Sequence, residues 1–383
     1  MVVADMKKKR VFISVNDPSA DAHCAGLIAA LKQAGAAIEF VGIGGPKMAA
    51  AGCELLESTV GKAVMGYNAV AHLGHYYALL RRVRAYLREH PVDLVIVCDS
   101  PSFNFHVAKA ANEAGIKTLF YVAPQLWAWG GWRIHKLRRL CDKLCCILPF
   151  EESWFRQRGV DTIFVGNPLL DKLPSDLTGL RKDYSHFEPR DARIALMPGS
   201  RSAEIGTLWR PMQEIAGRLK QKYPGMSFVV VAASDERRRL LEQAQVPGFT
   251  CEYSVDTVRD TASRVDFSIV ASGSATLEVA SSGCPMVTMY HTSPVLWHLI
   301  GRWLVRTKFF TLVNLLAGRR LVPEFIPFFK AVEPIIRAID DYLQDKDLLT
   351  RTSNELIDMV EPMTRKKAGD GVATIVTEML RQS

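Results

Sequence analysis

The feature that most constrains the fold of this chain is an alternation of short β-branched runs with longer stretches of helical period. Each run ends in a polar or glycine-rich turn, which is typical of strand–helix units in a parallel sheet. The expected strands cover 11–15, 38–42, 94–98, 118–122 and 143–148 in the first half, and 193–197, 228–232, 267–271 and 285–289 in the second. Because the pattern occurs twice, the sequence predicts an α/β protein with two Rossmann-like domains.

The segment 166–191 separates the two halves and is rich in Pro, Asp and Gly, so we interpret it as a linker. A chain of 383 residues is long enough to hold two hydrophobic cores. We therefore expect an N-terminal domain over 1–170 and a C-terminal domain over 190–346. Open parallel sheets bind ligands beyond the carboxyl ends of their strands, so we expect the two domains to face each other across a cleft.

Composition excludes several classes of protein. The chain is 48% hydrophobic and 23% charged, with no secretory signal and no apolar run of the ~18 residues that a spanning helix needs, so we expect a cytoplasmic protein. Its eight cysteines are too sparse for a disulfide framework, and their one cluster, at 141–146, lacks zinc-ligand spacing, so no metal is expected. The net charge of +8 favours an anionic partner, but no helix-turn-helix, zinc-finger or ribonucleoprotein motif supports nucleic acid.

The loop after the third strand of the second half has the composition of a phosphate-binding turn. Small residues leave the amides of Gly273, Ser274 and Ala275 free to meet an anion at the start of a helix. Glu278, one turn further on, could accept hydrogen bonds from a ribose diol. The alternative is an ordinary helix cap made by Ser272 or Ser274, with Glu278 exposed to solvent.

The loop after the first strand of the same half lies on the same rim of the sheet. Gly199 permits close backbone approach, and Arg201 offers forked donors that suit phosphate. The alternative is a capped helix start, in which Ser200 and Glu204 have helix-entry spacing and Arg201 pairs with Glu204. Two anion-ready loops in one half together favour a nucleotide diphosphate.

The first half contributes a candidate general base. Asp99 ends a strand of five apolar residues and could take a proton from an attacking hydroxyl. Its alternative role is an N-cap for the next helix, which a neighbouring serine could supply equally well. His23, which follows Ser19 and Asp21, is the rival base, although a lone histidine at a helix start is more often structural.

Other motifs give weaker predictions. Trp127 and Trp129 follow another expected strand, where their rings suit sugars and acyl chains or fill the core. A glycine-rich stretch at 42–46 misses the dinucleotide fingerprint because Lys47 replaces its last glycine. Two amphipathic basic stretches, at 76–88 and 296–306, could lie in a membrane interface, but packing on the protein's own sheets is the favoured alternative.

Taken together, these loops resemble the lipid-A-disaccharide synthases, glycosyltransferases with the two-domain B-type fold. The matching stretches are Gly-Gly-Pro-Lys-Met at 44–48, Val-Met-Gly at 64–66, Asp-Ser-Pro at 99–101 with Phe-Asn at 103–104, Tyr-Val at 121–122 with Trp-Ala-Trp at 127–129, Leu-Pro-Phe-Glu at 148–151, Phe-Val-Gly-Asn-Pro-Leu at 164–169, Pro-Gly-Ser-Arg at 198–201 with Glu204, Ser-Gly-Ser-Ala-Thr-Leu-Glu at 272–278, Asn-Leu-Leu-Ala-Gly at 314–318 and Val-Pro-Glu at 322–324. They run in a consistent order along most of the chain.

The resemblance implies an inverting transfer that joins UDP-2,3-diacylglucosamine to 2,3-diacylglucosamine 1-phosphate, giving a β(1→6) disaccharide and UDP without a metal or organic cofactor. It makes Asp99 the base that activates the acceptor's 6-hydroxyl. The implied donor site comprises Gly199, Ser200, Arg201, Glu204, Ser272, Gly273, Ser274, Ala275, Thr276, Glu278, Asn314 and Glu324. The implied acceptor side comprises Ser19, Asp21, His23, Met65, Asn104, Trp127 and Trp129.

The family also implies how the chain is placed and assembled. Its last helix returns to the first domain, here from about 347 to 383, and some members exchange that segment between subunits, so a homodimer is one expectation. A further expectation is a peripheral position on the anionic inner face of the cytoplasmic membrane.

The first loop departs from the family, which usually has Gly-Glu-x-Ser-Gly-Asp where this chain has Asn-Asp-Pro-Ser-Ala-Asp at 16–21. Ser102 and Asn167 also replace the Asp and His that are common there. A transferase with another acceptor, or a non-catalytic nucleotide-sugar-binding relative, therefore stays open as an alternative.

Overall fold

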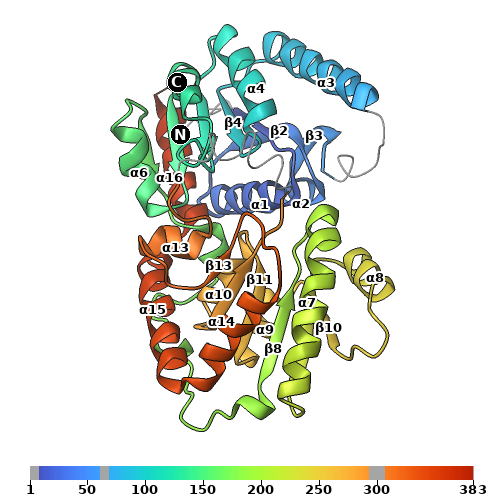
Figure 1. Cartoon of the computed structure of the whole chain (residues 1–383). Coiled ribbons are helices and arrows are strands. Elements are labelled where there is room, and N and C mark those ends of the chain that lie inside the picture. Colours follow the sequence, from blue (N-terminus) through green and yellow to red (C-terminus); the bar gives the residue numbers. More distant parts are fainter. Residues whose placement is uncertain (1–7, 61–68, 293–306, 383) are drawn as a thin grey trace. The chain divides into compact units, whose positions relative to one another are not determined.

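The computed structural model describes residues 8–60, 69–292 and 307–382. The chain divides into two compact units (Figure 1). The N-terminal unit comprises Met1–Asp171 together with Lys366–Ser383, and the C-terminal unit comprises Lys172–Arg365. Each unit is built around one parallel sheet with helices beside it, as the alternating pattern predicted.

The sheet of the N-terminal unit has seven parallel strands in the order β3-β2-β1-β4-β5-β6-β7. The strands are β1 Lys9–Ser14, β2 Ile38–Gly44, β3 Cys53–Ser58, β4 Leu94–Cys98, β5 Thr118–Tyr121, β6 Lys143–Cys146 and β7 Thr162–Phe164. The chain runs outward from β1 to β3 and then resumes on the other side of β1. The topological switch point, where such folds bind ligands, therefore lies between β1 and β4.

The helices of this unit are α1 Pro18–Gln33, α2 Pro46–Ala50, α3 Ala69–Glu89, α4 Pro101–Glu113, α5 Ile134–Leu140, α6 Pro149–Arg156 and α16 Ala368–Arg381, with a short 3₁₀ turn η2 at Gly131–Arg133. The last helix returns to the first unit and packs against α1 (Figure 1). Buried Leu27 of α1 and Val372 and Val376 of α16 share one apolar core with strand residues such as Ile13 and Ile96. This packing holds the C-terminal helix in place by burying its apolar face.

The sheet of the C-terminal unit has six parallel strands in the order β10-β9-β8-β11-β12-β13. The strands are β8 Arg193–Met197, β9 Ser227–Ala232, β10 Glu252–Val255, β11 Phe267–Ala271, β12 Met286–Met289 and β13 Glu324–Phe325. The helices are α7 Ser202–Lys222, α8 Asp235–Gln243, α9 Val258–Arg264, α10 Ala275–Ala280, α13 Leu312–Ala317, α14 Glu333–Gln344 and α15 Lys346–Thr364. Its switch point lies between β8 and β11.

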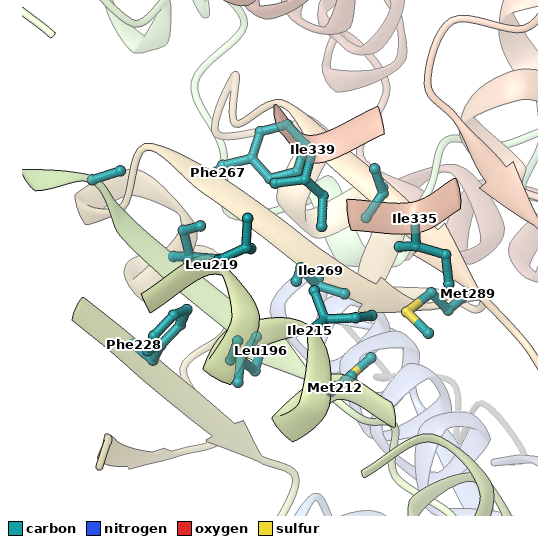
Figure 2. Close-up of a cluster of buried hydrophobic side chains, with 14 of the residues drawn as sticks. Leu196, Met212, Ile215, Leu219, Phe228, Phe267, Ile269, Met289, Ile335 and Ile339 are labelled. Carbon is teal, nitrogen blue, oxygen red and sulfur yellow. The ribbon is translucent and has the colours of Figure 1, made fainter. Parts of the chain in front are cut away.

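One apolar core joins the helices of the C-terminal unit to its sheet (Figure 2). The buried residues of α7 and α14 recur at helical spacing and share a core with buried side chains from four strands, β8, β9, β11 and β12. Those labelled in Figure 2 are Met212, Ile215 and Leu219 from α7, Ile335 and Ile339 from α14, and Leu196, Phe228, Phe267, Ile269 and Met289 from or beside the strands.

The chain returns to the N-terminal unit later than the sequence suggested. We expected the return from about 347, but α15 lies in the C-terminal unit, and the return begins at Lys366. The cause is packing, since Leu349 belongs to the core of the C-terminal unit and α15 contacts α10, α13 and α14.

The basic amphipathic stretch at 76–88 lies on α3. Its apolar residues Leu79, Leu80, Val83 and Leu87 are all buried, so they pack within the protein, the alternative that the sequence favoured. The second such stretch, at 296–306, lies outside the described residues. Where the structure describes the chain, its helices are too short or too polar to cross a bilayer.

Candidate functional site

A cavity of about 250 Å³ lies at the switch point of the C-terminal unit. It gathers most of the donor-site residues that the sequence predicted. They come from the loop after β8 and the loop after β11. The lining residues are Met197, Gly199, Ser200, Arg201, Glu204, Val231, Ala233, Asp256, Val258, Ala271, Ser272, Gly273, Ser274, Ala275 and Glu278.

The loop after β11 presents unused backbone donors to this cavity. Within the described parts of the chain, the amides of Gly273, Ser274 and Ala275 donate to no protein group. The serine side chains do not cap the helix, so the capping alternative is not what the structure contains. Thr276 is fully buried, and its hydroxyl donates to the Gly273 carbonyl at 2.7 Å, which fixes the turn. Three converging amides of this kind suit an anion.

Two carboxylates share the wall of the cavity. Burial raises the pKa of Glu278, and the nearby Asp256 carboxylate raises it further, while Arg259 opposes both effects. Asp256 has a left-handed backbone (φ 53°) and was missed by our sequence reading. It follows β10, an edge strand that the sequence did not predict, so no ligand-binding loop was expected at that position. Glu278 is placed to accept hydrogen bonds from a diol.

The loop after β8 combines the two roles that the sequence left open. The Glu204 carboxylate is buried and accepts from the amides of Ser200 at 3.0 Å and Arg201 at 3.2 Å, which is a helix-entry cap. Arg201 Nη1 also donates to Glu204 at 2.8 Å, yet the arginine side chain stays 80% exposed. Its remaining guanidinium donors are available to a phosphate. Glu204 therefore positions the loop, and Arg201 keeps the capacity to bind.

Besides Thr276, which fixes the turn, two predicted donor residues do not line this cavity. Asn314 is fully buried, donates to the Val322 carbonyl and accepts from the amides of Leu321 and Val322. The Glu324 carboxylate accepts from the amide of Thr311 at 3.1 Å, at the start of α13. Both side chains brace the segment between α13 and β13, and neither lines the cavity.

Asp99 lies at the switch point of the N-terminal unit, on a strained turn. Asp99 and Ser100 both adopt left-handed conformations, with φ of 50° and 43°. Each such conformation costs of order 1–3 kcal/mol for a residue other than glycine and persists only where the surroundings enforce it, commonly at functional sites. The Asp99 amide donates to the Tyr121 carbonyl at 3.1 Å, and Ser100 Oγ donates to Asp17 at 3.2 Å.

Asn104 is the side chain that enforces this turn. It is fully buried, and its Nδ2 donates to the carbonyls of Cys98 at 2.9 Å and Asp99 at 2.7 Å. Its Oδ1 accepts from Ser14 Oγ at 2.7 Å, which ties the turn to β1. The structure therefore makes Asn104 a positioning residue and gives it no free polar atom for an acceptor.

The altered first loop forms a capped helix start. Asp17 is the N-cap of α1 and accepts from the amides of Ser19 and Ala20. The Asp21 carboxylate is buried and accepts from the amides of Gly45, Lys47 and Met48 at 3.0 Å each, so it caps α2. Ser19 stays exposed, whereas Asp21 has a structural use.

The remaining acceptor-side residues differ in exposure. Burial lowers the pKa of His23, so its imidazole is neutral near pH 7. Trp127 is buried and donates from Nε1 to Glu151 at 2.9 Å, which fits core filling. Trp129 is 43% exposed, with the Arg133 guanidinium 4.9 Å from its ring centroid. Met65 lies outside the described residues.

Comparisons with known proteins agree on one family. The model of the lipid-A-disaccharide synthetase family matches residues 11–375. The chain is 34% identical over 375 residues to the lipid-A-disaccharide synthase of Geobacter metallireducens, covering 97% of each chain. It is 35% identical over 383 residues to that of Trichlorobacter lovleyi, covering 98% of this chain and 99% of the relative.

Solved structures resemble the fold at low sequence identity. The UDP-GlcNAc 2-epimerase of Neisseria meningitidis, bound to UDP-GlcNAc, superposes with a TM-score of 0.63 at 13% identity, covering 98% of this chain and all of the other. MurG of Acinetobacter baumannii gives 0.55 at 14% identity, covering 97% and 99%. These likenesses confirm the B-type glycosyltransferase fold that the sequence predicted.

Proposed function

Because the chain belongs to the lipid-A-disaccharide synthase family, a family of glycosyltransferases, we propose that it joins UDP-2,3-diacylglucosamine to 2,3-diacylglucosamine 1-phosphate. The products are UDP and a β(1→6)-linked disaccharide. The observation that carries this proposal is the cavity at the β8–β11 switch point, where three unpartnered amides and Arg201 converge.

The donor diphosphate binds to the amides of Gly273, Ser274 and Ala275 and to Arg201. As the bond from the anomeric carbon to the diphosphate breaks, negative charge develops on the departing UDP. Preorganised amides and a guanidinium stabilise that charge, because they need not reorient during the reaction. Glu278 accepts hydrogen bonds from the ribose of the same nucleotide.

Asp99 takes the proton of the acceptor's 6-hydroxyl as its oxygen attacks the anomeric carbon. Attack on the face opposite the leaving UDP inverts the configuration at that carbon. The strained turn and Asn104 hold the Asp99 backbone in one conformation, which reduces the entropy lost on reaching the reactive geometry.

We further propose that the reaction takes place at the cytoplasmic face of the inner membrane. The support is the net charge of +8 and the acylated substrates, which partition into bilayers. Sedimentation with vesicles that contain phosphatidylglycerol tests this part, and equal binding to vesicles of phosphatidylcholine alone would contradict an electrostatic attachment.

The test of the activity is Asp99→Asn. We expect disaccharide formation to fall by at least 10³-fold, while the heat of UDP binding in calorimetry stays unchanged, because the nucleotide residues lie in the other unit. Asp235→Asn, which removes an exposed carboxylate at the start of α8, is the matched control.

Near-normal turnover by Asp99→Asn would reject the assigned base, and no heat with UDP in the unchanged protein would reject the donor site. Mass spectrometry of the products identifies the acceptor. It therefore separates this proposal from a transferase with another acceptor, which the altered loop at 16–21 leaves as the second candidate.

A further inference from the structure

We propose that a basic pocket between α4 and α5 binds the phosphomonoester of the sugar acceptor. The inference rests on the proposed function and extends it by naming the residues that select a phosphorylated acceptor. The pocket belongs entirely to the N-terminal unit and has a volume of about 600 Å³. It lies between the N-terminal part of α4 and the segment formed by η2 and α5.

The walls of this pocket are aromatic and its charges are all positive. Phe105 is buried and contributes an apolar surface, while Trp132 is 61% exposed at the edge. The cationic lining residues are Arg133, Lys136 and Arg139, together with His135. No carboxylate is among the described residues that line the pocket.

These cations lack the carboxylate partners that several other basic residues of the unit have. Lys9, Arg82 and Lys143 each pair with a carboxylate at 2.7–2.9 Å. Across the described ranges, Arg133, Lys136 and Arg139 form no ion pair and no side-chain hydrogen bond.

Aromatic rings support two of these cations instead. The Arg133 guanidinium lies 4.9 Å from the Trp129 ring centroid and 5.7 Å from that of Trp132. The Lys136 ammonium lies 4.9 Å from the centroid of Phe105. Cation–π contacts of this kind fix a charge in place and leave its N–H groups unpaired, which suits a ligand with several acceptor oxygens.

The positive charges around the pocket contribute to lowered pKa values of nearby basic groups. Burial lowers the pKa of Lys136, and the charges of Arg133, Lys109 and Arg139 lower it further. Burial and the charge of Lys136 likewise lower the pKa of His106 on α4. A bound dianion would relieve this repulsion. The N-terminus of α4, a helix of 13 residues, adds its dipole on the side where Pro101 and Ser102 line the pocket.

Position identifies the ligand as the acceptor. Pro101 follows Asp99 by two residues, so their Cα atoms are at most ~7 Å apart. The acceptor must bring its 6-hydroxyl to Asp99, and its 1-phosphate is on C1, which the ring oxygen joins to the C5 that carries the 6-hydroxymethyl group. A pocket of this volume is of the size that holds a small organic ligand, which is more than a free phosphate requires.

The test compares two acceptors in the full-length enzyme. The double variant Lys136→Gln/Arg139→Gln removes two positive charges and keeps a polar side chain of several carbons at each position. We expect its kcat/KM for 2,3-diacylglucosamine 1-phosphate to fall about 10- to 100-fold, the loss typical of charge-assisted hydrogen bonds. Its kcat/KM for the acceptor without the phosphate, and its KM for the UDP-sugar, should match those of the unchanged enzyme.

Arg138→Gln is the matched control, because Arg138 is an exposed cation on the same helix that does not line the pocket. Thermal unfolding confirms that all variants fold. A readout independent of catalysis is calorimetry with glucosamine 1-phosphate, whose binding should weaken in the double variant and persist in Arg138→Gln.

The other outcomes overturn either this assignment or the proposed function. An equal loss with both acceptors would show that the two cations do not recognise phosphate. Unchanged kinetics with weaker binding to phosphatidylglycerol vesicles would assign the pocket to lipid headgroups instead. If the unchanged enzyme forms no disaccharide with either acceptor while glucosamine 1-phosphate still binds, the proposed function fails and the phosphate site stands.

Discussion

Replacing Asn104 with alanine should destabilise the N-terminal unit and slow the reaction together. The change removes three hydrogen bonds of 2.7–2.9 Å that link Asn104 to Ser14 Oγ and to two carbonyls in a fully buried site. At 0.5–1.5 kcal/mol for each of the three bonds, the free energy of unfolding falls by about 1.5–4.5 kcal/mol. A domain is stable by roughly 5–15 kcal/mol, so the variant should still fold at room temperature.

The functional effect follows from the same bonds. Without the Asn104 side chain, the left-handed turn of Asp99 loses its side-chain hydrogen bonds from α4, so we expect kcat to fall while the KM for the UDP-sugar stays constant.

A double-mutant cycle in urea with Ser14→Ala measures the coupling, which should be ~1 kcal/mol, since both changes break the same Ser14–Asn104 bond. Additive losses, or a cost for Asn104→Ala below ~1 kcal/mol, would refute this reasoning.

Two further predictions concern the loop after β8 and the buried Glu151. Gly199→Ala should lower the free energy of unfolding by ~1–3 kcal/mol and weaken UDP binding in calorimetry, because φ is 101° at this position and the new Cβ would overlap the Glu204 carboxylate. Gly206→Ala is the control, because the new Cβ would lie in open space inside α7 and should raise the free energy of unfolding by ~0.5–1 kcal/mol. Burial raises the pKa of Glu151 from 4.5 to about 7. Between these two pH values the folded state holds a proton on Glu151 that the unfolded state has lost, so the free energy of unfolding falls as the pH rises, by ~3 kcal/mol at most. Glu151→Gln should flatten this slope in thermal unfolding between pH 5 and 8, and an unchanged slope would contradict the raised pKa.

The strands that the sequence predicted and those it missed differ in one physical respect. All nine expected strands are present, and most of their residues are buried. The four missed strands are β3, β7, β10 and β13, which are the two edges of each sheet. An edge strand is covered on fewer sides, so its residues need not be apolar. The β10 sequence Glu-Tyr-Ser-Val and the two-residue β13 therefore carry no periodic signal.

For the candidate site, the sequence identified the loops better than the roles. Strand ends and small residues were enough to locate the cavity that contains Gly273 and Arg201. These sequence features do not distinguish a carboxylate that accepts hydrogen bonds from a ligand from one that accepts them from backbone amides, because both roles use the same chemistry. Both Glu204 and Asp21 are buried, and Glu204 accepts from amides of its own loop whereas Asp21 accepts from amides at the start of α2. Only the coordinates distinguish them from Glu278, which faces the cavity.

The same distinction bears on the departures in the first loop. Pro18 begins α1 and Ala20 is buried inside it, so neither position needs the left-handed backbone that only glycine adopts easily. Asp17 caps that helix and also accepts from Ser100 Oγ, which joins the exit of β1 to the turn that carries Asp99. A loop whose acidic side chain is used in this way positions Asp99, the proposed base, rather than contacting the sugar. Changes there should therefore alter kcat before they alter the choice of acceptor, whereas changes at the cations of the α4–α5 pocket should do the reverse.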